Sequence, residues 1–149
     1  MGSIALAIYP EERKKVALDT SKAVEIFAWG YKKGAIHMGI SAAVAGFAAL
    51  AAAFQTPPTG LPFSPRNYLL LLAPLHLANG VHTLLFMLPT NLRLLALREK
   101  ATKKDSSLTL SDEQEVETLL RKWKRLHYVR LTLGAVGWVA TLAVYMATL

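Results

Sequence analysis

The stretch "YLLLLAPLHLANGVHTLLFML", residues 68–88, contains no Lys, Arg, Asp or Glu and is long enough to cross a bilayer as a helix. Two more stretches share this property: "IHMGISAAVAGFAALAAAF", residues 36–54, and "LTLGAVGWVATLAVYMATL", residues 131–149. Each approaches the roughly 20 apolar residues that a spanning helix needs. The sequence therefore predicts an all-α fold: a membrane-embedded helical bundle with three full spans, in one domain over residues 1–149.

The segments outside these spans predict further helices. "SIALAIYP", residues 3–10, is apolar but too short to cross, and it lacks the basic region of a secretory signal. We expect a short N-terminal apolar stub there, which makes the architecture similar to a four-helix bundle. Residues 11–34 predict an amphipathic helix that leads into the first span. Ser111 is the expected N-cap of a second such helix, which runs into the third span.

The positive charge indicates topology rather than nucleic-acid binding. Of the 17 Lys and Arg residues, six lie in residues 11–33 and ten in residues 92–130. If the three spans alternate, 16 basic residues fall on one side, which is the positive-inside pattern. We therefore expect an integral membrane protein whose N-terminus and second-to-third-span loop are cytoplasmic, in the endoplasmic reticulum or a bacterial inner membrane. The lipid bilayer accounts for the charge, and no nucleic-acid partner is expected.

Polar side chains interrupt the second span. At 100° per residue, His76 and His82 lie about 60° to either side of Asn79, and Thr83 follows. One interpretation is interhelical hydrogen bonding that holds the bundle together. The other is a polar pocket inside the membrane, in which histidine carries protons. The spacing of these residues leaves both interpretations open.

Pro89, Thr90 and Asn91 follow where the second span leaves the membrane. We expect Pro89 to end or kink the helix, and Thr90 and Asn91 to cap the helix that continues in the cytoplasm. Asn91 also remains available for a pocket.

Trp123, His127 and Arg130 share one face of the cytoplasmic helix before the third span. An interfacial belt explains Trp123 and Arg130, but it explains His127 less well. The six-residue separation of His76 and His82 is not that of a ligand pair on one helix, and the chain contains no cysteine. We therefore expect no metal and no dedicated cofactor.

Two short motifs carry a resemblance to a known family. They are M-x-P-T-N-x-x-L, from Met87 to Leu94, and W-x-x-x-H-x-x-R, from Trp123 to Arg130; "WGYKKG", residues 29–34, is a looser match. Because both motifs occur in this order, the chain resembles the anthrone oxygenase-like (DUF1772) family of small membrane proteins. The resemblance implies a four-helix membrane bundle that oxidises an anthrone to a quinone with O2 in aromatic polyketide biosynthesis, without a recognised cofactor. We expect the chain to depart from the family at its first span, because "SIALAIYP" resembles only the end of such a span.

The implied reaction needs a base, donors for an oxyanion and an apolar pocket. We prefer His127 as the base, because it shares a motif with Arg130 at the same membrane interface as Asn91. The full catalytic set expected is His127, Asn91, Arg130, His82 and His76. The residues expected to bind a small aromatic polyketide are Asn79, Thr83, Trp123, Tyr31 and Phe86.

Other functions fit parts of the same pattern. A polyketide cyclase or isomerase would use the same pocket for acid–base chemistry without consuming O2. A non-catalytic scaffold or chaperone would dock a soluble synthase through its basic cytoplasmic face. A transporter or channel is disfavoured, because three spans make a poor pore without oligomerisation and no inverted repeat is visible. A homo-oligomer is compatible with the sequence.

Overall fold

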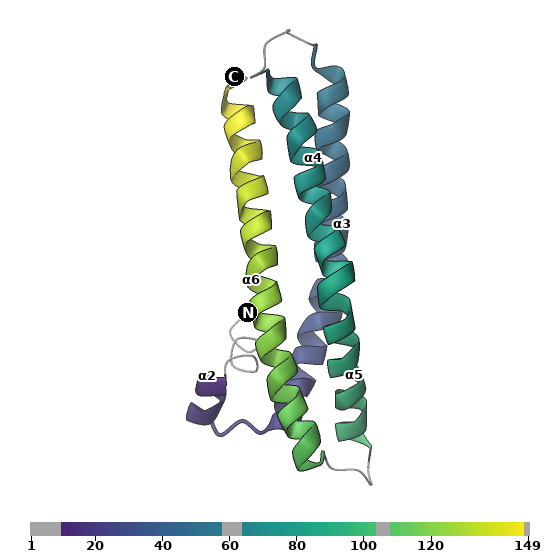
Figure 1. Cartoon of the computed structure of the whole chain (residues 1–149), viewed down its shortest axis with the longest axis vertical. Helices are drawn as coiled ribbons and strands as arrows, with labels where there is room; N and C mark the ends of the chain where they lie inside the picture. Colours follow the sequence, from purple (N-terminus) through teal and green to yellow (C-terminus); the bar gives the residue numbers. More distant parts are fainter. Residues whose placement is uncertain (1–9, 58–63, 104–107, 148–149) are drawn as a thin grey trace. The chain divides into compact units, whose positions relative to one another are not determined.

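The computed structural model describes residues 10–57, 64–103 and 108–147, and this part of the chain contains helices and no strand (Figure 1). The all-α prediction is therefore confirmed. The helices are α2 (Pro10–Lys15), α3 (Thr20–Gln55), α4 (Pro65–His82), the π-helix η1 (Thr83–Met87), α5 (Leu88–Thr102) and α6 (Leu110–Ala147). Residues 3–9 of the expected N-terminal stub lie outside the described residues, and Pro10 begins α2.

Within the part of the chain that the structure describes, two helical runs are long and apolar enough to cross a membrane, Pro65–Thr102 and Leu110–Met146. Only 11% and 6% of their most apolar windows are buried, so their apolar side chains face outward rather than into a protein core. The first predicted span, residues 36–54, lies within α3, whose apolar part Ile40–Gln55 is shorter. Apolar side chains that face outward are unfavourable in water but stable in hydrocarbon. The chain is therefore a helical membrane protein.

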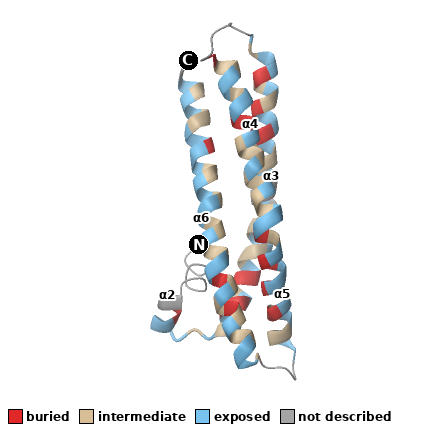
Figure 2. Ribbon diagram, in the orientation of Figure 1, coloured by how far each residue is buried: buried red, intermediate tan, exposed pale blue. Residues whose placement is uncertain are grey.

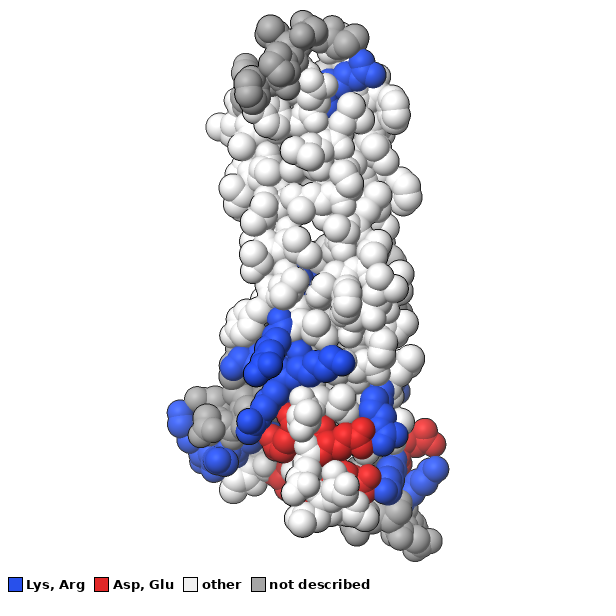
Figure 3. Space-filling model, viewed as in Figure 1, with Lys and Arg blue, Asp and Glu red and all other residues white. Residues whose placement is uncertain are grey.

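The chain forms two compact units, each described here by itself. The charged unit comprises Met1–Ile36 and Leu85–His127, and the apolar unit comprises His37–Leu84 and Tyr128–Leu149. All ten Asp and Glu residues belong to the charged unit, whereas the apolar unit has only Arg66 and Arg130 as formally charged residues. The charged atoms in Figure 3 accordingly gather over the charged unit.

The charged unit has an apolar core between the first half of α3, α5 and the first half of α6 (Figure 2). Its buried members recur at helical spacing on each element, so each helix contributes one apolar stripe. They are Ala23, Val24, Phe27, Leu94, Leu97, Val116 and Leu120. Helix α2 is attached to α6 by an ion pair between the buried Arg13 guanidinium and Glu117.

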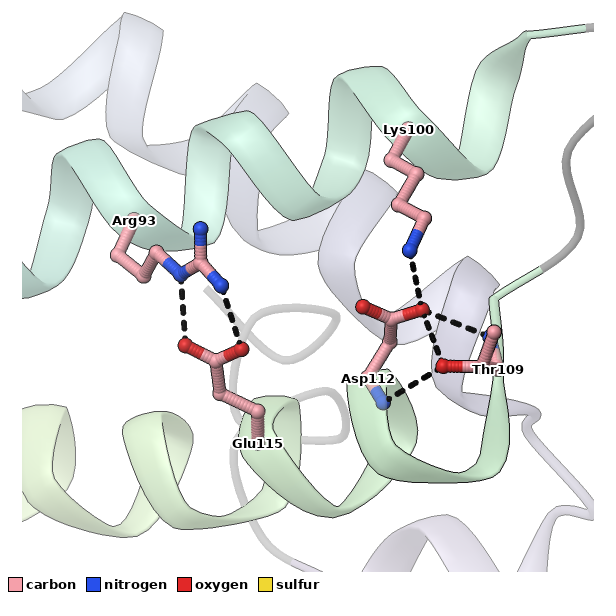
Figure 4. Close-up of polar contacts among 5 residues, drawn as sticks. All are labelled: Arg93, Lys100, Thr109, Asp112 and Glu115. Atoms are coloured by element: carbon pink, nitrogen blue, oxygen red, sulfur yellow. Dashed lines mark hydrogen bonds and ion pairs between the residues drawn. The ribbon is translucent and has the colours of Figure 1, made fainter.

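Two ion pairs connect α5 to α6 and fix their register (Figure 4). The Arg93 guanidinium donates to both Glu115 carboxylate oxygens, at 2.6 and 2.7 Å, and the Lys100 ammonium donates to Asp112 at 2.6 Å. The residue numbers fall along α5 as they rise along α6, so the two helices are antiparallel here.

Two predicted helix starts are wrong. Residues 11–34 do not form one helix, because the chain leaves the helical conformation after Lys15 and Ala17 has a φ of 50°. Helix α3 then begins at Thr20, where the Asp19 carboxylate accepts from the Lys22 N–H at 2.6 Å.

Helix α6 is capped by Thr109 rather than by Ser111. The Thr109 hydroxyl accepts from the Asp112 N–H at 3.3 Å, and the Asp112 carboxylate accepts from the Thr109 N–H at 2.8 Å. This reciprocal pair is a capping box, and it satisfies two N–H groups that the first helical turn leaves unpaired.

Of the two effects expected of Pro89, an end of the helix does not occur. The chain stays helical from α4 through η1 into α5, and Asn91 lies inside α5 rather than at its cap. Proline has no N–H to donate and its ring crowds the carbonyl four residues earlier, that of Leu85. The wider π-turn at Thr83–Met87 precedes Pro89 and accommodates both effects.

Candidate functional site

The most unusual polar groups of the charged unit are two neighbouring side chains of α5. Thr90 and Asn91 are only 2% and 3% exposed. Among the described residues, neither Thr90 Oγ1 nor Asn91 Oδ1 has a hydrogen-bond partner. Helical spacing places both on the same side of α5 as the buried Met87 and Leu94. An unsatisfied buried polar atom costs roughly 1–3 kcal/mol, so these two atoms are candidates for contact with a bound molecule.

A row of four rings connects α3 and α6 in the same unit. The His127 ring stacks on Trp123, with centroids 4.6 Å apart and an interplanar angle of 13°. Trp123 meets Phe27 edge-on at 5.6 Å, and Phe27 stacks on Tyr31 at 6.1 Å. Within the described structure, the buried Trp123 Nε1 has no acceptor. The row therefore fixes the orientation of His127 and contains an unused donor.

The register of α5 against α6 gives the axial distance between Asn91 on α5 and His127 on α6. Because Arg93 pairs with Glu115 and Lys100 with Asp112, Asn91 lies roughly level with Leu119, about one turn before Trp123. His127 is one further turn along α6. Asn91 and His127 thus lie about 10 Å apart along the helix axes.

The remaining sequence-predicted residues of this unit differ in their surroundings. Tyr31 is half-buried beside the core, where it continues the row of rings. Phe86 lies in η1 and is 55% exposed, so its position does not bring it into the core with Phe27.

In the apolar unit, His76 is positioned as a contact between α4 and α6. Its Nε2 lies 3.1 Å from Thr141 Oγ1, whose single proton is already donated to the Gly137 carbonyl at 2.8 Å. His76 must therefore donate from Nε2. A Cβ on Gly137 would lie 2.9 Å from His76 Cε1, so only glycine lets the ring approach this closely. This geometry matches the interhelical interpretation of His76.

The other polar residues of the apolar unit surround the same helix contact. Asn79 Nδ2 lies 3.5 Å from where a Cβ on Gly134 would be, and Asn79 Oδ1 has no partner among the described residues. The Thr83 hydroxyl donates to the Asn79 backbone carbonyl at 2.9 Å. His82 and Arg130 are both half-buried and belong to this unit, whereas His127 and Asn91 belong to the charged unit.

Two residues gain importance from the structure. Thr90 lies on the apolar stripe of α5 rather than at a cap, as its spacing from Met87 and Leu94 indicates. Phe27 lies one turn before Tyr31 and connects α3 to α6. Among the described residues, no group of three or more His, Asp or Glu side chains is arranged to hold a metal ion.

Fold and site together describe a helical membrane protein in whose charged unit buried polar atoms of Thr90, Asn91 and Trp123 have no partner among the described residues, and His127 stacks on Trp123. A family model described as "Anthrone oxygenase" matches residues 27–140, and the chain belongs to this family. The matched region includes Asn91, Trp123 and His127. Neither the curated proteins nor the solved structures contain a significant match to the chain.

Proposed function

We propose that this protein is a membrane-embedded oxygenase of aromatic polyketide biosynthesis that converts an anthrone-type methylene to a quinone carbonyl with O2. Family membership supports an oxygenase role in general. The observation that carries the assignment to the charged unit is the burial of Thr90, Asn91 and Trp123 Nε1 without partners among the described residues. A substrate with a carbonyl and phenolic hydroxyls offers the complementary groups.

His127 is the proposed base. The methylene of an anthrone is acidic, because its anion is delocalised over two aromatic rings and a carbonyl. An imidazole removes one methylene proton near neutral pH, and stacking on Trp123 holds the ring in place. The Asn91 amide and the Trp123 N–H donate to the negative charge that develops on the carbonyl oxygen.

The resulting anion is electron-rich enough to reduce O2 directly, so no dedicated cofactor is required in this proposal. One electron passes to O2, and the two radicals combine to form a C–O bond. Imidazolium then protonates the distal oxygen to give a hydroperoxide. Removal of the second methylene proton breaks the O–O bond, forms the C=O and releases hydroxide, which leaves as water. One oxygen atom enters the quinone and the other becomes water.

The proposed location is the endoplasmic reticulum of a fungus or the inner membrane of a bacterium, with the charged unit in the cytoplasm. The positive-inside pattern supports this orientation. The substrate then enters from the cytoplasm or from the headgroup region, where a planar aromatic molecule partitions readily.

Oxygen uptake tests this function. Detergent-purified protein treated with a metal chelator is given a simple anthrone, and uptake is compared with the spontaneous rate. We expect catalysed uptake in the wild type and a loss of about 100-fold or more in His127→Ala, the usual contribution of a general base. His37→Ala, at an exposed position in α3, is the matched control and should retain activity.

The alternatives give other outcomes in the same experiment. Conversion of a polyketide substrate without O2 consumption would replace the oxygenase by a cyclase or isomerase that uses the same site. If the wild type is folded but shows no reaction above background, the non-catalytic scaffold would be the remaining candidate function.

A further inference from the structure

Five basic side chains of the charged unit form what we call the basic belt: Lys32, Lys33, Arg121, Lys122 and Arg125. All five are exposed. Helices α3 and α6 run in the same direction here, with Phe27 against Trp123. This register places the belt residues within a band about 12 Å tall. Figure 3 shows Lys and Arg side chains gathered on one face of the charged unit.

The carboxylates of the charged unit are largely paired with other cations. Glu115 pairs with Arg93, Asp112 with Lys100, Glu25 with Lys22 and Glu99 with Lys103, at 2.6 to 3.5 Å. The hydrogen bond and charge of Lys22 hold the pKa of Glu25 below its usual value, so this carboxylate stays ionised. Within residues 10–57, 64–103 and 108–147, no belt residue forms an ion pair. The belt is therefore a concentration of uncompensated positive charge.

On both helices, the belt lies about two turns before an apolar segment. Lys33 lies seven residues before the apolar segment Ile40–Gln55, and Arg125 lies six residues before Leu131. At 1.5 Å per residue, these charges are about 10 Å from the first apolar residues, which is the depth of a lipid headgroup layer. Arg121 and Arg125 are also four residues apart, so their guanidinium groups lie on one helix face and suit a phosphate.

We propose that the basic belt binds the phosphate groups of anionic phospholipids in the bilayer around the chain. Charge and position both favour this ligand, because each Lys or Arg near an anionic surface contributes attraction while the headgroup phosphate remains hydrated. The belt then sets the depth of the charged unit at the membrane surface. This inference is independent of the reaction catalysed.

The test uses the full chain in a neutral detergent, with phosphatidylglycerol or phosphatidylcholine added. The temperature of unfolding reports binding, because a ligand specific for the folded state stabilises it. We expect phosphatidylglycerol to raise this temperature more than phosphatidylcholine, and high salt to remove the difference. Arg121→Gln with Arg125→Gln should weaken the apparent affinity by about fivefold per charge, roughly 25-fold in total.

Lys22→Gln with Lys103→Gln is the matched control, since it removes the same charge from exposed positions outside the belt. It should retain most of the response to phosphatidylglycerol. Equal responses to the two lipids, or equal losses in the two double variants, would overturn the proposal. Competition by soluble glycerol phosphate at lipid-like concentrations would instead indicate a free-phosphate site. Belt-dependent binding of polyglutamate without any lipid preference would indicate an acidic protein partner.

Discussion

At the scale of single residues, Gly137 is the clearest example of a residue type that a neighbouring side chain requires. The His76 ring occupies the space that any Cβ at this position would need. Glycine in a helix is otherwise unfavourable by about 1 kcal/mol relative to alanine. Its presence in α6 is therefore explained by close packing against α4.

Gly137→Ala should destabilise the protein by about 1–3 kcal/mol, because the new methyl displaces the His76 ring and its hydrogen bond to Thr141. Reversible unfolding in detergent measures this change. Gly80→Ala is the control, since a Cβ there meets nothing within 4 Å. That variant should be neutral or gain up to about 1 kcal/mol. Equal effects of the two substitutions would contradict the packing role.

Residue types and helical spacing singled out Asn91, Trp123 and His127 as candidates, and their roles stay predictions. The same patterns did not decide between the interhelical and the pocket interpretation of His76, because both fit the spacing on a single helix. The distinction depends on partners from elsewhere in the chain. Thr141 lies 65 residues from His76, and its hydroxyl was not among the expected polar contacts.

At the scale of secondary-structure elements, the start of α6 depends on Thr109. Thr109→Ala removes the hydroxyl that accepts from the Asp112 N–H, so we expect a loss of about 1 kcal/mol in unfolding free energy. Thr118→Ala is the control within α6, because the Thr118 hydroxyl only donates to the Gln114 carbonyl of an existing turn. It should be neutral or slightly stabilising. The cap assignment is wrong if both variants behave alike.

The element boundaries show where sequence patterns were insufficient. Apolar runs predicted the helices themselves, because burial in hydrocarbon requires continuous hydrogen bonding. Pro89 predicted an interruption, but the chain absorbs it in the π-turn Thr83–Met87 and remains helical. A π-turn adds a residue to one turn and changes which side chains share a face. Asn91 consequently lies in a buried position of α5 rather than at a cap.

At the scale of the whole molecule, charge and apolar surface are sorted between the two units. The sequence predicted this separation, because the Lys, Arg, Asp and Glu residues cluster outside the apolar runs. The break between α2 and α3 was not predicted, since residues 16–19 contain neither glycine nor proline. The first apolar segment, Ile40–Gln55, is shorter than the expected span.

The absence of cysteine makes the proposed orientation directly testable, because an introduced thiol is the only one in the chain. Gln55→Cys and Thr102→Cys each replace an exposed polar residue, at the ends of α3 and α5. In sealed vesicles with the cytoplasmic face inside, a membrane-impermeant maleimide should label Cys at 55 at once. It should label Cys at 102 only after permeabilisation. The reverse pattern would contradict the positive-inside orientation.

We propose that the Asn91 side chain, whose buried Oδ1 has no partner among the described residues, is maintained for substrate rather than for stability. Asn91→Leu tests this claim most directly, with unfolding free energy and anthrone-dependent oxygen uptake measured on the same preparation. Met87→Leu, on the same face of α5, is the control and should change little in either. We predict that Asn91→Leu is as stable as the wild type or more stable by about 1 kcal/mol, because an unsatisfied buried amide oxygen is removed. Its uptake should fall by about 100-fold, the usual cost of losing one oxyanion donor. A variant that is strongly destabilised, or that retains full uptake, would contradict the account.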